Sequence, residues 1–360
     1  MTIKRRISVA PKDATALPAT ISVVIPCYNY ALYLQDAVTS ALEQPGVAVN
    51  VIIVDDKSSD NSLEVANALA QRDNRVTVVA HEMNSGPVKT FNDGLAQMSG
   101  EFLVRLDADD MLTPGALSRA VQVMRAYPSV GLVYGHPLHF TADPPPPARA
   151  QPSRWTIWPG VEWLTDRCRA GTNVITSPEV VMRRQVVDLV GGQQDLAHTH
   201  DMEMWLRIAA FSDVAYIHGV DQAWHRDHPN SLSATKVDVL KDLHERRDCF
   251  DVLFSGIAGT LPQAAQLHRM AMMALATDAV ELASRQYDRA VANLDLVDAF
   301  IAIARELVEN VEDIPGWAGL QRRMAMGSSK SHRHPGFVAR RFLRGLVGMY
   351  RRRRWHRTGV

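Results

Sequence analysis

Pairs of carboxylates follow two apolar segments in the first third of the chain. Asp107 and Asp109 follow one segment, and Asp55 and Asp56 end another. Carboxylates that gather in this way repel one another unless a cation or hydrogen-bond donors lie beside them. Because Asp107 and Asp109 are two residues apart, an extended backbone would point both side chains the same way. Oxygen ligands in small number suit Mg²⁺ or Mn²⁺, which keep positions open for phosphate oxygens, so we expect such a metal beside a diphosphate.

These carboxylates lie where apolar runs alternate with stretches of helical spacing. The β-branched apolar runs predict strands at Ile21–Pro26, Val49–Asp56, Arg75–Ala80, Phe102–Asp107 and Val130–Gly135. The stretches between them predict helices at Tyr33–Leu42, Asn61–Arg72, Val88–Met98 and Pro114–Tyr127. This alternation is typical of βαβ units, and continuous apolar runs are typical of parallel strands buried on both faces. We expect an α/β doubly wound, Rossmann-like domain with a mostly parallel sheet, whose ligand binds beyond the carboxyl ends of the strands.

The rest of the chain changes character in steps. Asp143–Pro152 includes four consecutive prolines and predicts an exposed loop. A helical stretch covers Asp201–Phe211, and the pattern is helical again from Lys236 to about Leu307. We expect four regions: a flexible lead-in at 1–20, the main domain at 21–234, a helical extension at 235–320 and a basic tail at 321–360.

The composition is that of an ordinary globular protein. Apolar residues make up 46% of the chain and charged residues 22%. No run approaches the roughly 20 apolar residues that a transmembrane helix requires, and the N-terminus has no apolar stretch typical of a signal peptide. Cys27, Cys168 and Cys249 lie far apart without CxxC spacing, which predicts buried thiols rather than disulfides or a zinc site. We therefore expect a cytoplasmic protein.

Several short motifs occur in a fixed order over about residues 20–233. They are VVIPCYNY at 23–30, VDDKSSDNS at 54–62, NSGP at 84–87, LDADD at 106–110, NVITSPEVVMRR at 173–184, HDMEMWLRIA at 200–209 and HRDHPNSLS at 225–233. Each motif is short, but the ordered set resembles glycosyltransferase family 2. The resemblance implies the GT-A fold, a nucleotide-diphosphate sugar donor and an inverting mechanism. It also implies a donor half at about 21–140 and an acceptor half at about 153–234.

Carried over by position, the resemblance implies roles for residues of the donor half. Pro26 and Tyr28 would line the pocket of the nucleotide base, and Asp56 would hydrogen-bond the base, expected to be uracil. Phe91 occupies a place where the family often has a basic residue. Lys89 would supply the missing positive charge near the diphosphate.

The resemblance also implies the metal-binding and catalytic residues. Asp109 would be the direct ligand of Mn²⁺ or Mg²⁺, and Asp107 would be shared between the ribose and the metal. His228 would complete the metal shell, and Arg226 would grip phosphate oxygens. Asp201 corresponds to the general base that takes the proton of the acceptor hydroxyl as it attacks the anomeric carbon. Because Asp201 opens a predicted helix, it also fits an N-cap.

The expected acceptor is a saccharide or a lipid-linked molecule, and two other functions compete with transfer. A nucleotidyltransferase would need a glycine-rich, basic loop after the first strand, which instead leads into Pro26-Cys27-Tyr28-Asn29. A catalytically inactive protein that binds a sugar nucleotide, or acts as a scaffold on the same fold, is the main alternative. Donor binding without transfer would identify it.

The net charge of zero conceals a basic tail. Residues 321–360 contain twelve Lys or Arg residues and no Asp or Glu, so the other 320 residues hold 27 basic and 39 acidic ones. In FVARRFLRGLVGMY at 337–350, helical geometry separates most arginines from most apolar side chains. Such a helix, followed by RRRRWHR, is typical of segments that lie on an anionic membrane. We expect peripheral association with the inner membrane face, with a disordered or protein-bound tail as the alternative. Nucleic acid is not an expected partner, since no base-stacking array accompanies the arginines.

Overall fold

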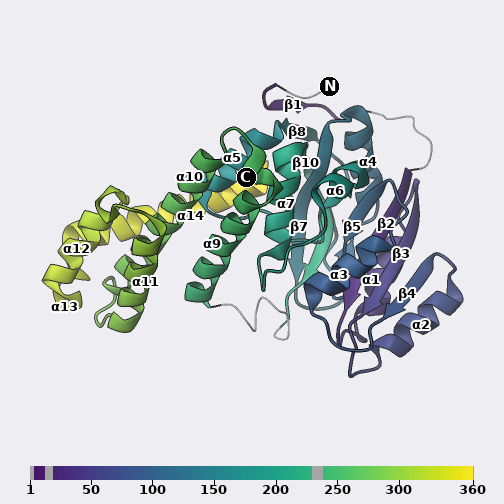
Figure 1. The fold of residues 1–360 in the computed structure, drawn as a ribbon, viewed down its shortest axis with the longest axis horizontal. Coiled ribbons are helices and arrows are strands. Elements are labelled where there is room, and N and C mark those ends of the chain that lie inside the picture. The colour runs from purple at the N-terminus through teal and green to yellow at the C-terminus, as the bar shows by residue number, and fades with distance from the viewer. Residues whose placement is uncertain (1–3, 13–18, 229–237, 360) are drawn as a thin grey trace. The chain divides into compact units, whose positions relative to one another are not determined.

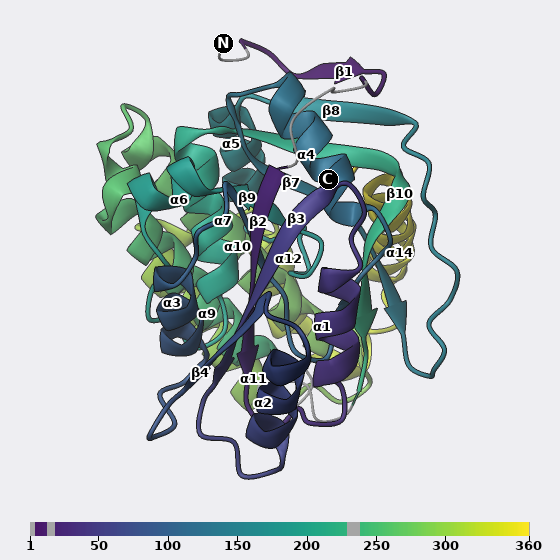
Figure 2. The ribbon, with the colours of Figure 1, turned by 90° about the vertical axis from the view of Figure 1, so that its right-hand side faces the viewer.

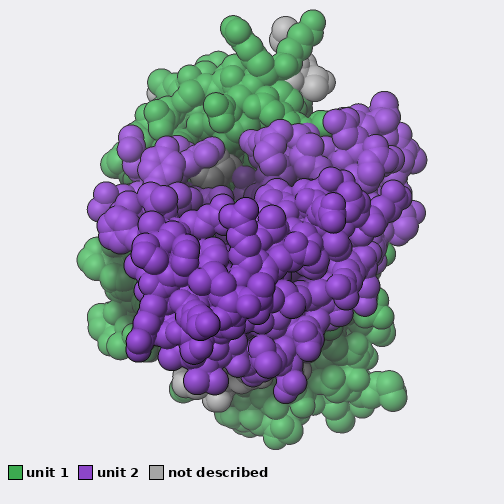
Figure 3. All heavy atoms as spheres, turned by 90° about the vertical axis from the view of Figure 1, so that its left-hand side faces the viewer, with its two compact units in different colours: residues 1–164, 174–235, 359 green, residues 165–173, 236–358, 360 purple. Residues whose placement is uncertain are grey.

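The computed structural model of the chain describes residues 4–12, 19–228 and 238–359 (Figure 1). These residues divide into two compact units (Figure 3). Unit 1 takes its residues from 1–164, 174–235 and 359, and unit 2 from 165–173, 236–358 and 360. The end of the HRDHPNSLS motif, residues 229–233, lies outside the described residues, as do 1–3 and 13–18 of the expected lead-in.

The first half of the sheet in unit 1 is parallel, as the alternation of strands and helices predicts. Strand β2 pairs with β3 on one side and β5 on the other, and β3 pairs with β4. Their bounds are β2 Ala19–Cys27, β3 Val47–Asp55, β4 Val76–Ala80 and β5 Phe102–Arg105. All four strands therefore bring their carboxyl ends to one edge of the sheet, where the predicted polar residues lie.

Helices cover both faces of this parallel part (Figure 2), because alternate strand residues point to opposite sides. Val23 belongs to the same core as the apolar faces of α1 (Leu34–Leu42), α2 (Ser62–Arg72) and α4 (Ala116–Ala126). The next residue, Val24, meets α3 (Pro87–Ala96). A Cβ atom on Gly94 of α3 would lie 2.5 Å from Val24 Cγ1 and 2.9 Å from Val54 Cγ2, so this close helix packing requires glycine.

The second half of the sheet is mixed. Strand β7 (Val130–Phe140) runs parallel to the long β10 (Asp213–Arg226), and β9 (Val181–Arg183) joins β7 to β5 by antiparallel pairing. Strands β6 (Met111–Leu112) and β8 (Arg154–Trp158) both pair antiparallel with β10. With β1 at Ile7–Val9, the sheet order is β1-β8-β10-β7-β9-β5-β2-β3-β4. Strand β7 extends well beyond the expected Gly135, because its last residues pair with the end of β10.

The expected flexible lead-in is wrong for part of its length. Residues Ile7–Val9 form strand β1, which pairs antiparallel with the otherwise free edge of β8. Pairing satisfies backbone N–H and C=O groups that the edge strand would otherwise leave open. A three-residue strand is too short to show an alternating pattern in the sequence.

Three helices of the acceptor half follow β8. They are α5 (Gly160–Ala170), α6 (Arg184–Val190) and α7 (His200–Phe211). Helix α7 is buried along nearly its whole length, including Met202, Trp205 and Ile208. The predicted stretch at Asp201–Phe211 is therefore a core helix, and its first turn carries the expected general base.

Unit 2 is helical, as the pattern from Lys236 onward predicts. Its elements are α9 (Val239–Ser255), η1 (Ile257–Thr260), α10 (Ala264–Gln286), α11 (Leu294–Leu307), η2 (Val311–Asp313), α12 (Trp317–Met326), α13 (Ser328–Ser331) and α14 (Pro335–Thr358). Helix α12 continues across residue 320, so the structure has no break there between extension and tail. None of the helices in the described ranges combines the length and apolar character needed to cross a membrane.

The three cysteines are buried and form no disulfide in the part of the chain that the structure describes, as their spacing predicts. Burial raises the pKa of Cys27 and of Cys168 to about 12, so both thiols stay protonated at neutral pH. They act as small apolar side chains of the core.

Candidate active site

The acidic motif forms a tight turn after β5. Strand β5 ends at Arg105, and the Asp110 N–H donates a 3.0 Å hydrogen bond to the Asp107 carbonyl oxygen. The backbone is therefore not extended through Asp109, and the expectation that alternation alone points Asp107 and Asp109 the same way is wrong. Their carboxylates have different partners, although the charge of Asp107 still raises the pKa of Asp109.

Asp109 lies beside the imidazole that the resemblance assigns to the metal. His228 Nε2 is 2.8 Å from Asp109 Oδ2, and each side chain is about 10% exposed. Burial, followed by the charge of Asp107, raises the pKa of Asp109, whereas the hydrogen bond to His228 opposes that shift. The rings of Tyr30 and Tyr33 lie against His228, with centroids 6.0 and 5.4 Å away. A buried carboxylate in contact with an imidazole provides two ligands that a divalent cation could bind.

Arg105 is the main cation under this turn. Its guanidinium contacts both carboxylate oxygens of Asp107, at 2.8 and 3.0 Å, and Nη1 donates to Ser177 Oγ at 3.0 Å. Burial opposes the charge on Arg105, but the carboxylates of Asp107 and Asp201 outweigh it and raise the guanidinium pKa. Arg105 therefore places Asp107 and Asp201 in one electrostatic network. Sequence reasoning missed it, although an arginine that ends the apolar run FLVR is an available signal.

Asp201 lies in the first turn of α7, and the N-cap interpretation is wrong. The helix begins at His200 with Thr199 as its N-cap residue, so Asp201 is already inside the helix. Its Oδ1 accepts a 2.6 Å hydrogen bond from the Met202 N–H. Burial lowers the pKa of neighbouring His200, and the charge of Asp201 opposes this shift. The negative charge suits the amino end of a helix dipole.

Glu203 and Arg207 hold α7 to the segment before it. Both side chains are almost fully buried, and the two are joined by hydrogen bonds of 2.8 and 2.9 Å. Arg207 also donates to the carbonyl oxygens of Val190, Gly191 and Gly192. This salt bridge fixes the helix that carries Asp201.

Asp56 anchors the segment that precedes α3. Its carboxylate accepts hydrogen bonds from the N–H groups of Ser85, at 2.7 Å, and Gly86, at 2.9 Å. His81 Nδ1 lies 2.8 Å from the same carboxylate. His81 was missed, because it is 25 residues away and belongs to no motif. These interactions keep the end of β3 and the start of α3 together.

The other expected donor residues occupy different surroundings. Tyr28 follows β2 and is 45% exposed, and Pro26 lies within β2. Lys89 is on α3, where its Nζ donates to Asp93 at 2.6 Å and its side chain is 60% exposed. Lys89 is thus already paired within its own helix, and among the described residues no hydrogen bond or ion pair joins it to the Asp107–Asp110 turn.

Arg226 is held firmly at the end of β10. Its Nη1 donates to both carboxylate oxygens of Asp143, at 2.9 and 3.0 Å. The guanidinium lies over the rings of Tyr33 and Phe140, 4.7 and 4.6 Å from their centroids. The Arg226 N–H donates to Asp110 Oδ1 at 2.9 Å. The turn after β5 and the end of β10 are therefore fastened together, which brings Asp107, Asp109, Arg226 and His228 into one region.

Comparison with known proteins assigns a family to the first half of the chain. Residues 22–188 match the family model described as Glycosyl transferase family 2. An uncharacterised glycosyltransferase of Nostoc is 39% identical over 114 residues, which are 32% of this chain and 35% of that protein. The GalNAc(5)-diNAcBac-PP-undecaprenol beta-1,3-glucosyltransferase of Campylobacter jejuni is 37% identical over 103 residues, or 28% of this chain and 33% of that protein. The chain spans about a third of the length of these relatives.

Solved structures match over more of the chain. S. aureus TarS 1-349 in complex with UDP-GlcNAc has a TM-score of 0.56 at 17% identity, over 87% of this chain and 89% of that one. The mannosyltransferase PcManGT from Pyrobaculum calidifontis, in complex with GDP-Man and Mn²⁺, has a TM-score of 0.51 at 19% identity, over 90% and 89%. At these identities the likeness concerns the fold. It confirms the predicted GT-A-type sheet with a helical C-terminal region.

The Glu203–Arg207 pair gives a stability prediction. Glu203→Ala leaves the buried Arg207 charge without its carboxylate, and we expect the free energy of unfolding to fall by about 3 kcal/mol or more. Urea unfolding followed by circular dichroism measures it. The matched control is Asp188→Ala, which breaks an exposed (i, i+4) pair with Arg184 on α6 and should cost much less. Equal, small losses in the two variants would contradict a supporting role for the buried pair.

Proposed function

We propose that this chain, whose residues 22–188 form a glycosyltransferase family 2 domain, moves a sugar from a nucleotide diphosphate to a hydroxyl acceptor with inversion. The observation that carries the proposal is the network at the end of β5. There Asp109 lies against His228, while Arg105 links Asp107 electrostatically to Asp201. Asp109 and His228 suit the binding of a metal-bound diphosphate, and Asp201 suits the role of base for the acceptor.

Asp201 is the proposed general base. In a direct displacement, the acceptor hydroxyl gives its proton to Asp201 as its oxygen forms a bond to the anomeric carbon. The bond from that carbon to the diphosphate oxygen breaks with its electron pair, and the configuration inverts. Although burial opposes the shift, the carboxylates of Asp107 and Asp201 raise the pKa of Arg105, so the proposed base lies near a buried cation.

Asp109 and His228 are the proposed ligands of Mn²⁺ or Mg²⁺, with Asp107 turned to the ribose or the metal. These residues suit a metal because Asp109 and His228 contact each other, and each could bind a cation in place of that contact. When bound, the cation would offset the charge that develops on the departing diphosphate. Arg226, whose Nη2 is buried without a hydrogen-bond partner, would add a donor for phosphate oxygens.

A uridine nucleotide is the proposed donor. Pro26, Tyr28 and Asp56 would form the base site at the ends of β2 and β3, and Lys89 would lie near the diphosphate. TarS was solved with UDP and with UDP-GlcNAc, which supports a uridine donor for a chain of the same fold. PcManGT was solved with GDP-Man and Mn²⁺, which supports the use of a divalent metal.

The proposed acceptor is a saccharide or a lipid-linked molecule at the cytoplasmic face of a membrane. The name of the C. jejuni relative includes PP-undecaprenol, a polyprenol linked through a diphosphate. Helix α14 supports a membrane location, because it carries exposed apolar side chains beside arginines and has no acidic residue. Phe342 and Tyr350 are each 68% exposed. Arg344 instead turns toward its own unit, where it pairs with Asp288.

Asp109→Asn tests the metal site. We expect the variant to lose the Mn²⁺-dependent part of the thermal shift caused by UDP-sugars, because an amide does not replace a charged ligand. Donor affinity in the presence of Mn²⁺ should fall at least about tenfold. Loss of a residue that only hydrogen-bonds a metal ligand already weakens metal binding by about that much, and Asp109 is itself the proposed ligand. Asp188→Asn, at an exposed position of α6, is the control. Unchanged Mn²⁺-dependent binding would remove Asp109 from the site.

Asp201→Asn separates catalysis from binding. The variant should bind the donor as the wild type does, while its kcat for transfer falls about 10²- to 10⁴-fold, the usual contribution of a general base. Calorimetry measures donor binding, and release of nucleoside diphosphate measures turnover. Full transfer by Asp201→Asn would exclude this assignment. Donor binding with no turnover in the wild type would instead favour the inactive sugar-nucleotide-binding alternative.

Exposed apolar residues of α14 give a test of membrane association. In the full chain, Phe342→Glu with Leu346→Glu should lower binding to anionic vesicles at least about tenfold, since two apolar side chains no longer insert. Vesicle sedimentation measures the binding. The control pair, Val291→Glu with Leu294→Glu, alters two residues of unit 2 outside α14 that are 81% and 59% exposed. If both pairs bind vesicles as the wild type does, α14 does not insert.

A further inference from the structure

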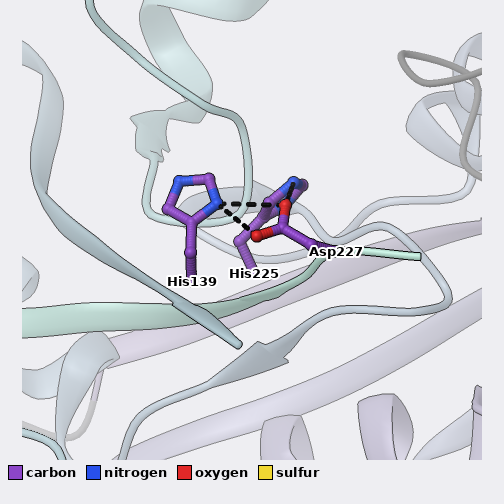
Figure 4. A group of neighbouring side chains, drawn as sticks. All are labelled: His139, His225 and Asp227. Carbon is purple, nitrogen blue, oxygen red and sulfur yellow. Dashed lines mark hydrogen bonds and ion pairs between the residues drawn. The ribbon is translucent and has the colours of Figure 1, made fainter. Parts of the chain in front are cut away.

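Two histidines stand next to each other at the carboxyl ends of β7 and β10, outside the site described above. His139 of β7 and His225 of β10 are direct partners in the parallel register of these strands. Asp227 follows His225 by two residues, and its N–H donates to the Phe140 carbonyl oxygen at 2.8 Å, so the strand pairing continues through it. Because residues two apart on a strand share a face, all three side chains lie on the same side of the sheet (Figure 4).

The three side chains converge at distances close to those of a metal site. His139 Nδ1 lies 3.2 Å from both carboxylate oxygens of Asp227, and His225 Nε2 lies 3.7 Å from Asp227 Oδ1. One ligand atom from each residue falls within 4.8 Å of the others. With bonds of about 2.0–2.1 Å, the ligand atoms of a tetrahedral zinc ion are roughly 3.3 Å apart. Only small side-chain movements would therefore be needed for all three to reach one ion.

His225 is oriented in the way that metal-binding histidines usually are. Its second ring nitrogen, Nδ1, lies 3.0 Å from Asp110 Oδ2, and the Asp110 side chain is completely buried. A carboxylate at one nitrogen fixes the tautomer, so that the other nitrogen presents its lone pair. Here that other nitrogen, Nε2, is the one that faces Asp227 (Figure 4).

The cluster is exposed enough for an ion to reach it from solvent. His139 is 46% and Asp227 49% exposed at the side chain, whereas His225 is 21% exposed. A site with three protein ligands and one side open to solvent would bind water or another small ligand at its fourth position. The half-exposed pair could adjust around an ion while His225 remains fixed.

We propose that His139, His225 and Asp227 form a second metal site, which binds Zn²⁺ or a similar borderline divalent ion. Two imidazoles and one carboxylate favour such an ion over Mg²⁺ or Mn²⁺, which prefer sites dominated by oxygen. The site is separate from Asp109 and His228 in its ligands, but it is adjacent through Asp110. It pins the ends of β7 and β10 beside the Asp107–Asp110 turn, and it does not depend on the proposed transferase activity.

Metal binding to the full chain, without nucleotide sugar, tests the proposal. We expect one equivalent of Zn²⁺ to bind in calorimetry and raise the Tm, and Co²⁺ to give the visible absorption of a tetrahedral site. His139→Ala and Asp227→Asn, made separately, should each weaken Zn²⁺ binding at least about tenfold and abolish that absorption. Both side chains are half-exposed, and circular dichroism would verify that each variant is folded.

Two controls locate the ion. His268→Ala breaks a histidine–carboxylate pair with Asp251 at 2.7 Å that belongs to no three-ligand group among the described residues, and it should bind Zn²⁺ normally. Asp109→Asn should also keep the zinc site. The proposal is overturned if the wild type binds no Zn²⁺, which would leave an ion-pair cluster, or if His139→Ala and Asp227→Asn bind as the wild type does. It is equally overturned if Asp109→Asn alone removes the ion, which would then belong with His228.

Discussion

The compensation of buried negative charge at the end of β5 is the constraint on which the rest of the site depends. Asp107, Asp109 and Asp110 lie within one turn, and an uncompensated buried carboxylate costs several kcal/mol. Each is matched by a cation or imidazole. Arg105 meets Asp107, while His228 and His225 from the end of β10 meet Asp109 and Asp110. The long β10 strand is thus needed for electrostatic reasons as well as for the sheet.

This requirement explains the irregular path of β10. Its register against β7 shifts between Tyr216 and Asp221 and again between Asp221 and Ala223. Bulges of this kind redirect the side chains that follow. Beyond them, the Arg226 N–H reaches Asp110, and His228 reaches Asp109. A straight strand without these shifts would present its last residues at other positions along β7, away from the turn.

The sequence predicted the parts of the fold whose signals are local, and it failed where partners are distant. Continuous apolar runs identified β2 to β5, whereas β1 and β9, with three residues each, have no period to detect. The expectation that Asp107 and Asp109 point the same way requires the strand to continue through them, but β5 ends at Arg105. The motifs selected Asp109, Arg226 and His228, which the fold does gather near the turn. They could not reveal His81 as the partner of Asp56, because the two are 25 residues apart and such a contact leaves no pattern in a single sequence.

The three acids of the turn are not equivalent, and their partners explain why Asp109 is the best candidate for a metal ligand. Asp107 is held by both ends of the Arg105 guanidinium, a group that cannot bind a metal. Asp110 is completely buried and accepts from both His225 and the Arg226 N–H, so its oxygens are occupied. Asp109 has an imidazole as its partner, which is itself a metal ligand and can turn from the carboxylate to a shared ion. Asp109 and His228 are therefore the side chains of this network that can bind a metal, whereas Asp107 and Asp110 hold the turn in place.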